Sequence, residues 1–162
     1  MPRDKAAFSF IEVITVMILI AILAVVWVAV PIAPNQLIGS AYRIMSDLRY
    51  SQHLAITRQV PCGVSFNITG NNYFVYIGNL TTKATDPLTG NPLIVNLNTA
   101  SEYKGVRITK TNFGGLVYFD FLGRPYDSAG TLLTAQGVIG LATGIYTQSV
   151  TIEPNTGEVK VP

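Results

Sequence analysis

Phe8-Ser9-Phe10-Ile11-Glu12-Val13-Ile14-Thr15-Val16-Met17 opens an almost wholly apolar stretch that continues to Val30. One carboxylate, Glu12, lies inside this stretch. An ionised acid in hydrocarbon costs about 2.5–3.5 kcal/mol on insertion scales, so it persists there only with a partner. No basic residue occurs between Phe8 and Tyr42. A partner for Glu12 must therefore come from another molecule or from processing of this one.

Cleavage of the chain between Ala7 and Phe8 would supply that partner. The new α-amino group of Phe8 would be a cation four residues from Glu12 in the sequence. It would lie at the membrane depth where the carboxylate of a neighbouring molecule needs a counter-charge. The sequence therefore indicates that this apolar stretch mediates the assembly of one molecule with another.

The residues around this cut resemble the N-terminal signature of type IV prepilins and type II secretion pseudopilins. In that family a short basic leader precedes a small residue, the cut falls before Phe, and Glu is the fifth residue of the mature chain. Residues 8–12 follow the pattern one for one, whereas Ala7 replaces the usual Gly and the leader contains Asp4. The resemblance implies cleavage by a membrane aspartic prepilin peptidase, N-methylation of Phe8, and stacking of the apolar helices into a filament through Glu12.

Two other interpretations of the apolar stretch remain open, a secretory signal peptide and a plain membrane anchor. A carboxylate early in the apolar region is unusual for a signal peptide, and the candidate cleavage sites at its end are poor. A cut after Ala29 would place Trp27 where a small residue is needed, and a cut after Ala33 would leave Pro34 next in the chain. The prepilin interpretation is therefore favoured.

Charge predicts the orientation of the chain in a membrane. Arg3 and Lys5 precede the apolar stretch, and the next charge beyond Glu12 is Arg43. A positive flank stays in the cytoplasm, so the C-terminal part should be exported. About 20 apolar residues at ~1.5 Å each cross ~30 Å of hydrocarbon. We therefore expect a leader at residues 1–7 and a single membrane-spanning assembly helix at 8–34, in the inner-membrane lipid, with a periplasmic C-terminal domain.

A second helix is predicted for residues 35–58, with Asn35 as its N-cap. Pro31 and Pro34 should break or kink the chain before it. Arg43 and Asp47 have the spacing of an i,i+4 pair, worth at most about 0.5 kcal/mol, and a solvated face is the favoured interpretation of these charges. The apolar residues of this segment recur at three- or four-residue intervals, with Ile38, Met45 and Ile56 widening the stripe: Leu37, Ala41, Ile44, Leu48 and Ala55.

Residues 59–162 change to the pattern of strands and turns. A hairpin is predicted at 63–78 around Gly70-Asn71-Asn72, and a polar loop at 81–92, which we expect to project and contact a partner. The closing hairpin should turn at Pro154-Asn155-Thr156-Gly157. The remaining predicted strands are 93–97, 106–109, 116–121, 131–134, 146–153 and 158–161. These elements predict an α+β fold, in which a long N-terminal helix packs on an antiparallel β domain of two sheets.

Three segments, one in the second predicted helix and two in the β-rich region, resemble the GspH/FimT group of minor pilin-like proteins. They are residues 46–58, which resemble that group's helical run of the Leu-x-x-Ala-Arg-x-x-Ala type, residues 119–125, with a Gly-Arg turn, and residues 150–157, a closing hairpin. The resemblance implies a minor subunit of a filament whose partners are other pilin or pseudopilin subunits and an inner-membrane assembly platform, with secreted cargo a further partner.

Composition and charge exclude several other classes of function. The net charge of +2 and the two basic residues after Lys110, Arg124 and Lys160, offer no DNA-binding surface, so nucleic acid is not expected as a partner. Cys62 is the only cysteine, so an internal disulfide is impossible, and we expect a small buried thiol or a link between chains.

An enzyme is the third class of function that we consider. Cys62, His53 and Asp120 contain the groups of a thiol triad, but no nucleophile motif flanks them. His53 has no companion ligands at metal spacing. We therefore expect no catalytic residues, metal or cofactor. The favoured function is a minor pseudopilin of a type II secretion system, and the alternative is a FimT-like minor pilin of a type IV pilus.

Overall fold

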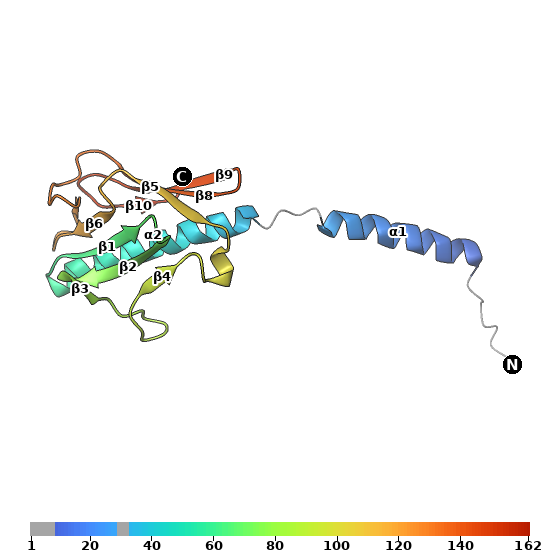
Figure 1. Cartoon of the computed structure of the whole chain (residues 1–162), viewed down its shortest axis with the longest axis horizontal. Coiled ribbons are helices and arrows are strands. Elements are labelled where there is room, and N and C mark those ends of the chain that lie inside the picture. Colours follow the sequence, from blue (N-terminus) through green and yellow to red (C-terminus); the bar gives the residue numbers. More distant parts are fainter. Residues whose placement is uncertain (1–8, 29–32) are drawn as a thin grey trace. The chain divides into compact units, whose positions relative to one another are not determined.

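The computed structural model describes residues 9–28 and 33–162 of the chain (Figure 1). The chain forms two units, which divide between Ile32 and Ala33 and are described separately below. The first unit contains the helix α1 (Phe10–Val28), and the second contains the helix α2 (Ala33–Arg58) and ten strands. Pro31 and the predicted cleavage site at Ala7 and Phe8 lie outside the described residues.

Apolar residues surround α1 on every side. Between Phe10 and Ala24 the only polar side chains are those of Glu12 and Thr15, and all the residues in this range are exposed within the chain. Among the described residues, no helix combines the length and the apolarity that crossing a membrane requires.

The helix α2 begins two residues before its predicted start. Asn35 lies inside the first turn, so its prediction as the N-cap is wrong. Pro34 lies at the second helical position, where its missing N–H removes no hydrogen bond of the helix. Pro34 therefore lies in the opening turn of the second helix.

Six strands form the first sheet, in which the order β3-β2-β1-β6-β7 is completed by pairing of β4 with β2. Its pairs are antiparallel, and the predicted hairpin joins β1 and β2. The strands are β1 (Cys62–Asn67), β2 (Asn72–Ile77), β3 (Asn79–Lys83), β4 (Ile94–Asn96), β6 (Leu116–Phe119) and β7 (Pro125–Tyr126). Residues 81–83 belong to β3, so the polar loop is shorter than predicted and begins at Ala84.

A second antiparallel sheet has the strand order β10-β9-β8-β5, and a short 3-10 helix, η1 (Ser101–Tyr103), precedes β5. The prediction of a strand at 131–134 is wrong, because among these residues only Leu132 makes an isolated bridge, to Tyr126. The strands of this sheet are β5 (Arg107–Thr111), β8 (Gly137–Thr143), β9 (Tyr146–Ile152) and β10 (Val159–Lys160). Neither β7 nor β8 was predicted from the sequence.

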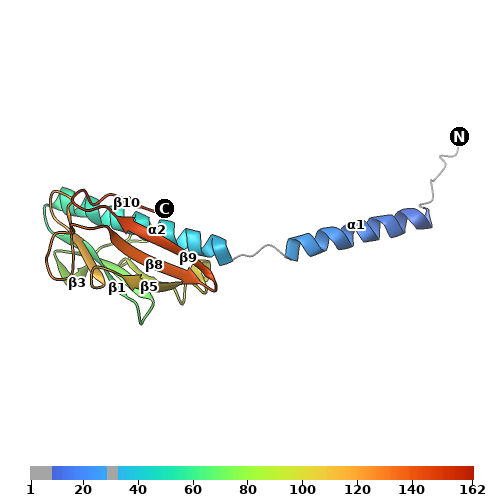
Figure 2. The same cartoon turned by 90° about the horizontal axis from the view of Figure 1, so that it is seen from above.

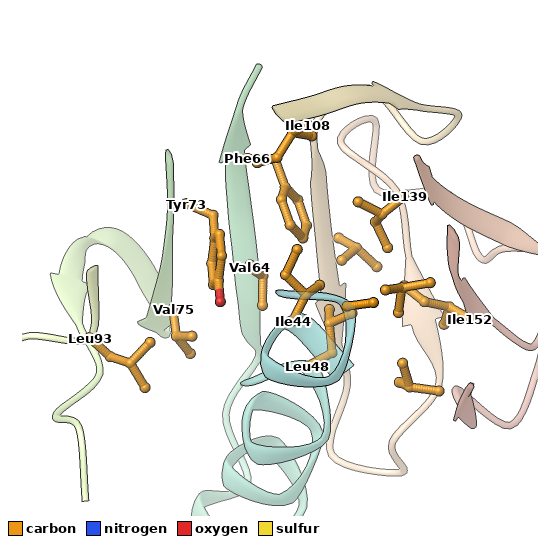
Figure 3. Close-up of a cluster of buried hydrophobic side chains, with 14 of the residues drawn as sticks. Ile44, Leu48, Val64, Phe66, Tyr73, Val75, Leu93, Ile108, Ile139 and Ile152 are labelled. Atoms are coloured by element: carbon orange, nitrogen blue, oxygen red, sulfur yellow. The ribbon is translucent and has the colours of Figure 1, made fainter. Parts of the chain in front are cut away.

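The core of the second unit lies between α2 and the two sheets (Figures 1 and 2). Figure 3 shows Ile44 and Leu48 of α2 pointing among side chains of both sheets. All five residues of the predicted stripe are buried, whereas Ile38 and Ile56 are exposed and do not widen it. Met45 packs against the core from its edge. This arrangement confirms the predicted α+β class.

Candidate functional site

Glu12 lies in the first turn of α1. The backbone carbonyl of Ser9 accepts hydrogen bonds from the N–H groups of Glu12 at 2.9 Å and of Val13 at 3.2 Å, which fixes the start of the helix just before Phe10. A carboxylate in the first turn of a helix is stabilised by the positive end of the helix dipole.

The other polar side chain of the apolar segment needs no outside partner. The hydroxyl of Thr15 donates to the backbone carbonyl of Ile11 at 2.8 Å. Glu12 has no ion-pair partner among the described residues. Between Phe10 and Ala24, the Glu12 carboxylate is thus the polar group that remains available to a cation from outside.

Asp47 is buried rather than solvated, which corrects the prediction for this residue. One of its carboxylate oxygens accepts a hydrogen bond from the hydroxyl of Tyr73 at 2.7 Å and from Nε of Arg43 at 3.0 Å. Tyr73 comes from β2 and is itself fully buried. The predicted i,i+4 pair with Arg43 therefore exists, but it is part of a buried network between the helix and the first sheet.

Burial and pairing act on this network in opposite directions. Burial raises the pKa of Asp47 above its ordinary value, although the Tyr73 hydroxyl and the Arg43 charge both act to lower it. For Arg43, burial acts to lower the pKa, but the charge of Asp47 and the hydrogen bond to it, with smaller contributions from Tyr73 and Tyr103, together outweigh burial and raise the pKa. Arg43 is therefore always a cation, while Asp47 loses its proton less readily than an exposed aspartate.

Arg43 also fastens the polar loop to α2. Its guanidinium lies 3.5 Å from the carboxylate of Asp86, and the hydroxyl of Tyr50 donates to the carbonyl of Thr85 at 3.1 Å. Hydrogen bonds with the N–H groups of the following residues help to lower the pKa of Asp86. Leu88, two residues further on, is 88% exposed. The loop thus has a fixed base on the helix and an apolar side chain at its surface.

Gln52 joins the three segments that carry the resemblance to minor pilin-like proteins. Its side-chain amide donates to the carbonyl of Gly123 at 2.8 Å and to the carbonyl of Thr156 at 3.0 Å. Gln52 lies in the helix segment, Gly123 in the Gly-Arg turn, and Thr156 in the closing hairpin. Three segments that are far apart in the sequence therefore meet at one side chain.

The Gly-Arg turn is built around the carboxylate of Asp120. It accepts hydrogen bonds from the N–H groups of Leu122 and Arg124, both at 2.9 Å, and pairs with the Arg124 guanidinium at 2.7 Å. Burial opposes ionisation of Asp120, but these bonds from Arg124 and Leu122 outweigh it and lower the pKa. The role of Asp120 is therefore to hold a turn.

The three residues that were considered as a thiol triad do not contact one another. Cys62 is fully buried, its thiol donates to the carbonyl of Val60 at 3.5 Å, and burial raises its pKa. His53 is exposed on α2, and Asp120 is engaged by Arg124. A thiol with a raised pKa is a poor nucleophile at neutral pH. The prediction of a small buried thiol at Cys62 is confirmed.

Hollows in the described part of the chain differ in their lining, and one beside the polar loop is lined by residues that include Arg43, Asp47 and Asp86. Another of about 610 Å³ lies on the second sheet, and its lining includes Thr109, Lys110, Gly140 and Ser149. Within residues 9–28 and 33–162, no group of three His, Cys, Asp or Glu side chains is placed to hold a metal ion. None of the predicted site residues lines the hollow on the second sheet.

Two of the polar side chains that connect α2 to the β domain, Tyr73 and Gln52, were not predicted from the sequence. Tyr73 alternates with Val75 toward the helix, so its place on the inner face follows from the strand pattern. Its bond to Asp47 depends on the packing of β2 against α2. Nothing in the pattern around Gln52 predicts two carbonyl partners more than 70 residues away.

Comparison with known proteins relates this arrangement to solved structures. No protein-family model and no curated protein sequence matches the chain. The minor pseudopilin EpsH from the Type 2 Secretion System of Vibrio cholerae matches with a TM-score of 0.57 and 11% identity, over 78% of this chain and 96% of that chain.

A second solved protein, the type IV minor pilin FimU of Pseudomonas aeruginosa, matches in two crystal forms. One form gives a TM-score of 0.53 at 10% identity, over 81% of this chain and 91% of that chain. The other form gives a TM-score of 0.51 at 9% identity, over 76% of this chain and 90% of that chain. The chain therefore has the pilin-like fold of a minor pseudopilin and a minor type IV pilin, with a helix packed on two antiparallel sheets.

Proposed function

We propose that this protein is a minor pseudopilin, a structural subunit of a type II secretion pseudopilus that takes part in protein export across the outer membrane. One observation carries the proposal: an apolar segment contains a single carboxylate, Glu12, which has no ion-pair partner within residues 9–28 and 33–162, and this segment precedes a domain that has the pilin-like fold. The fold likeness extends over 96% of the EpsH chain, which supports a related role.

In this proposal a prepilin peptidase removes residues 1–7, and Phe8 becomes the N-methylated first residue. The segment 8–34 holds the subunit in the inner membrane, with its N-terminus cytoplasmic and its domain periplasmic, until an assembly platform adds it to the filament. Apolar helices gain little by leaving lipid for one another, so polar pairing has a large influence on assembly.

The pair between Glu12 and the Phe8 amine of a neighbour would set the register of the subunits. Any other stagger leaves a charge unpaired in a medium of low dielectric constant, which is strongly unfavourable. The first-turn position of Glu12 supports this role, because the carboxylate lies at the very start of the helix. Thr15 does not compete for the amine, since its hydroxyl is bonded within the helix.

Replacement of Glu12 by alanine tests the proposal. We expect Glu12→Ala and Glu12→Gln to leave the protein in the membrane fraction with an unchanged thermal transition of the domain. Both variants should lose co-purification with partner pilins, since both remove the charge. Thr15→Val is the matched control, because it changes the other polar residue between Phe10 and Ala24 and should co-purify like wild type. Undiminished co-purification of Glu12→Ala would contradict the proposal.

A second candidate is a FimT-like minor pilin of a type IV pilus, and the likeness to FimU supports it. DNA uptake is not part of this candidate's support, because the two basic residues after Lys110 are both ion-paired. Arg124 lies 2.7 Å from Asp120, and Lys160 lies 3.0 Å from Glu158. Deletion of the gene distinguishes the candidates: loss of protein secretion supports the pseudopilin, and loss of piliation supports the pilin.

We propose no catalytic activity for the protein. The chemistry of this function would be the pairing of charges between subunits, and no residue that touches a substrate is needed for it. Cys62→Ala should therefore leave secretion and filament assembly unchanged. Loss of secretion or of filament assembly in a Cys62→Ala variant with a normally folded domain would support the enzyme hypothesis instead.

A further inference from the structure

The turn between β8 and β9 carries two exposed apolar side chains. Ile145 is 89% exposed and Tyr146 is 41% exposed. The backbone of Gly144 has φ of +55°, and open space surrounds it. This hairpin tip, residues 143–146, thus presents an isoleucine and a tyrosine outward from the second sheet, although neither contributes to the core.

The hairpin tip lies at the end of the domain where α2 begins. Arg49 of α2 donates to the carbonyl of Val159, which pairs with Ile152 of β9. Strand β9 covers about 20 Å between Ile152 and Tyr146. A piece of α2 of the same length, measured back from Arg49, reaches about residue 36, near the start of the helix. Figures 1 and 2 both show the β8–β9 turn beside the first turns of α2.

Two exposed cations lie beside the tip, Lys104 and Arg107. Arg107 pairs with Ala142 of β8, and Gly105 lies next to Thr143. The segments 98–107 and 142–147 contain one acidic residue, Glu102. This end of the domain therefore combines apolar and aromatic groups with a small excess of positive charge.

Two further exposed apolar residues, Ile38 and Tyr42, lie on the first three turns of α2. Tyrosine is enriched at the boundary between lipid and water, where its ring is buried and its hydroxyl is hydrated. Lysine and arginine near such a boundary are attracted to anionic headgroups. The side chains of this surface are better suited to the headgroup layer of a phospholipid bilayer than to bulk water.

We propose that the hairpin tip, with Lys104 and Arg107, docks on the headgroup layer of the membrane that holds the N-terminal segment. The inference rests on the proposed function, in which that segment is inserted in lipid. Only residues 29–32 separate the two helices in the sequence, and five residue steps span at most ~18 Å. In the proposed function, this chain length limits the distance between the inserted segment and the first turn of α2.

A spin label measures this contact in the full-length protein. Cys62 is fully buried, so the wild-type chain should take up no label, and a cysteine introduced at the surface is labelled alone. Ile145→Cys places the label at the tip. Leu122→Cys is the matched control, because Leu122 is 61% exposed in the turn that Gln52 holds, and Gln52 lies roughly 28 Å along α2 from Ala33.

The labelled protein is reconstituted in vesicles of phosphatidylethanolamine and phosphatidylglycerol. We expect the label at residue 145 to be several-fold less accessible to a water-soluble nickel relaxation agent than the label at residue 122. Lys104→Gln with Arg107→Gln should remove this protection. Arg58→Gln with Lys83→Gln, which changes two exposed cations elsewhere on the domain, should leave it in place.

Equal accessibility at residues 145 and 122, in a chain that resists alkaline extraction from the vesicles, would overturn the docking proposal and leave the proposed function standing. A chain that alkali extracts completely would overturn both. Protection at residue 145 that appears only after partner pilins are added would overturn the docking proposal, because the surface would then be covered by a neighbouring subunit.

Discussion

Asp47 is a carboxylate whose surroundings favour its neutral form. It is 5% exposed, and the hydroxyl of Tyr73 reaches it across the interface between α2 and the first sheet. The guanidinium of Arg43 is a third exposed, so its attraction for Asp47 is partly screened by water. Burial therefore outweighs pairing, and the pKa of Asp47 is raised above its ordinary value of 3.8.

This raised pKa predicts an unusual pH dependence for Asp47→Asn. As the pH rises above 3.8, the unfolded chain releases the proton of Asp47 before the folded protein does, so the free energy of unfolding of the wild type falls. Asparagine has no such proton. We expect the advantage of the wild type over the variant to be greatest near pH 4 and to shrink toward pH 7, as measured by urea unfolding of the detergent-solubilised protein.

Other carboxylates do not obscure this comparison. The pKa values of Asp86 and Asp120 are lowered, so each contributes stability that is lost as the pH falls below 3.8, in wild type and variant alike. An advantage of the wild type that grows between pH 4 and pH 7 would mean that the Arg43 pair dominates. That result would contradict the predicted effect of burial.

At the scale of elements, the closing hairpin depends on a close approach of two turns. Gly157 has φ of +68°, and a Cβ atom there would meet the carbonyl of Gly123, the amide of Gln52 and the ring of Phe119. Only glycine avoids both the backbone strain and the collision. The junction of the three segments thus requires this residue.

Gly157→Ala should destabilise the domain by about 3 kcal/mol, the sum of the left-handed backbone and overpacking costs. Gly144→Ala is the matched control, since its φ is +55° and no atom lies within 4 Å of the added Cβ. It should cost only about 1 kcal/mol. Urea unfolding of both variants measures the difference. Equal losses would show that the turns do not pack as closely as described.

Periodicity predicts the elements whose apolar positions repeat, and it fails where tertiary contacts decide the structure. The stripe of α2 is regular, so sequence analysis finds its buried face. Strand β8 contains Gly137 and Gly140, which have low strand propensity. It forms because β9 and β5 supply hydrogen-bonding partners on both sides, and Gly140 fits closely against Thr109 and Lys110. Those contacts are set by the fold as a whole.

At the scale of the whole molecule, a fold is retained while most side chains differ. The similarity to EpsH and FimU persists at 9–11% identity. What must persist is the alternation of buried residues in the strands and the stripe on α2, which many sequences satisfy. The predicted pairing of Glu12 with a neighbouring subunit rests on the need of a charge in lipid for a partner. Neither the packing of the domain nor its fold likeness tests that prediction.

Processing of the N-terminus provides that test. The native protein, extracted from membranes, should have the mass of a chain that begins at Phe8 and carries one methyl group, because only cleavage creates the cation that Glu12 requires. Ala7→Arg should block cleavage by replacing the small residue before the cut. Glu12→Ala should be shortened like wild type and yet fail to assemble, since its cleavage site is intact. Recovery of an intact Met1 and no form that begins at Phe8 would remove the basis of intermolecular pairing.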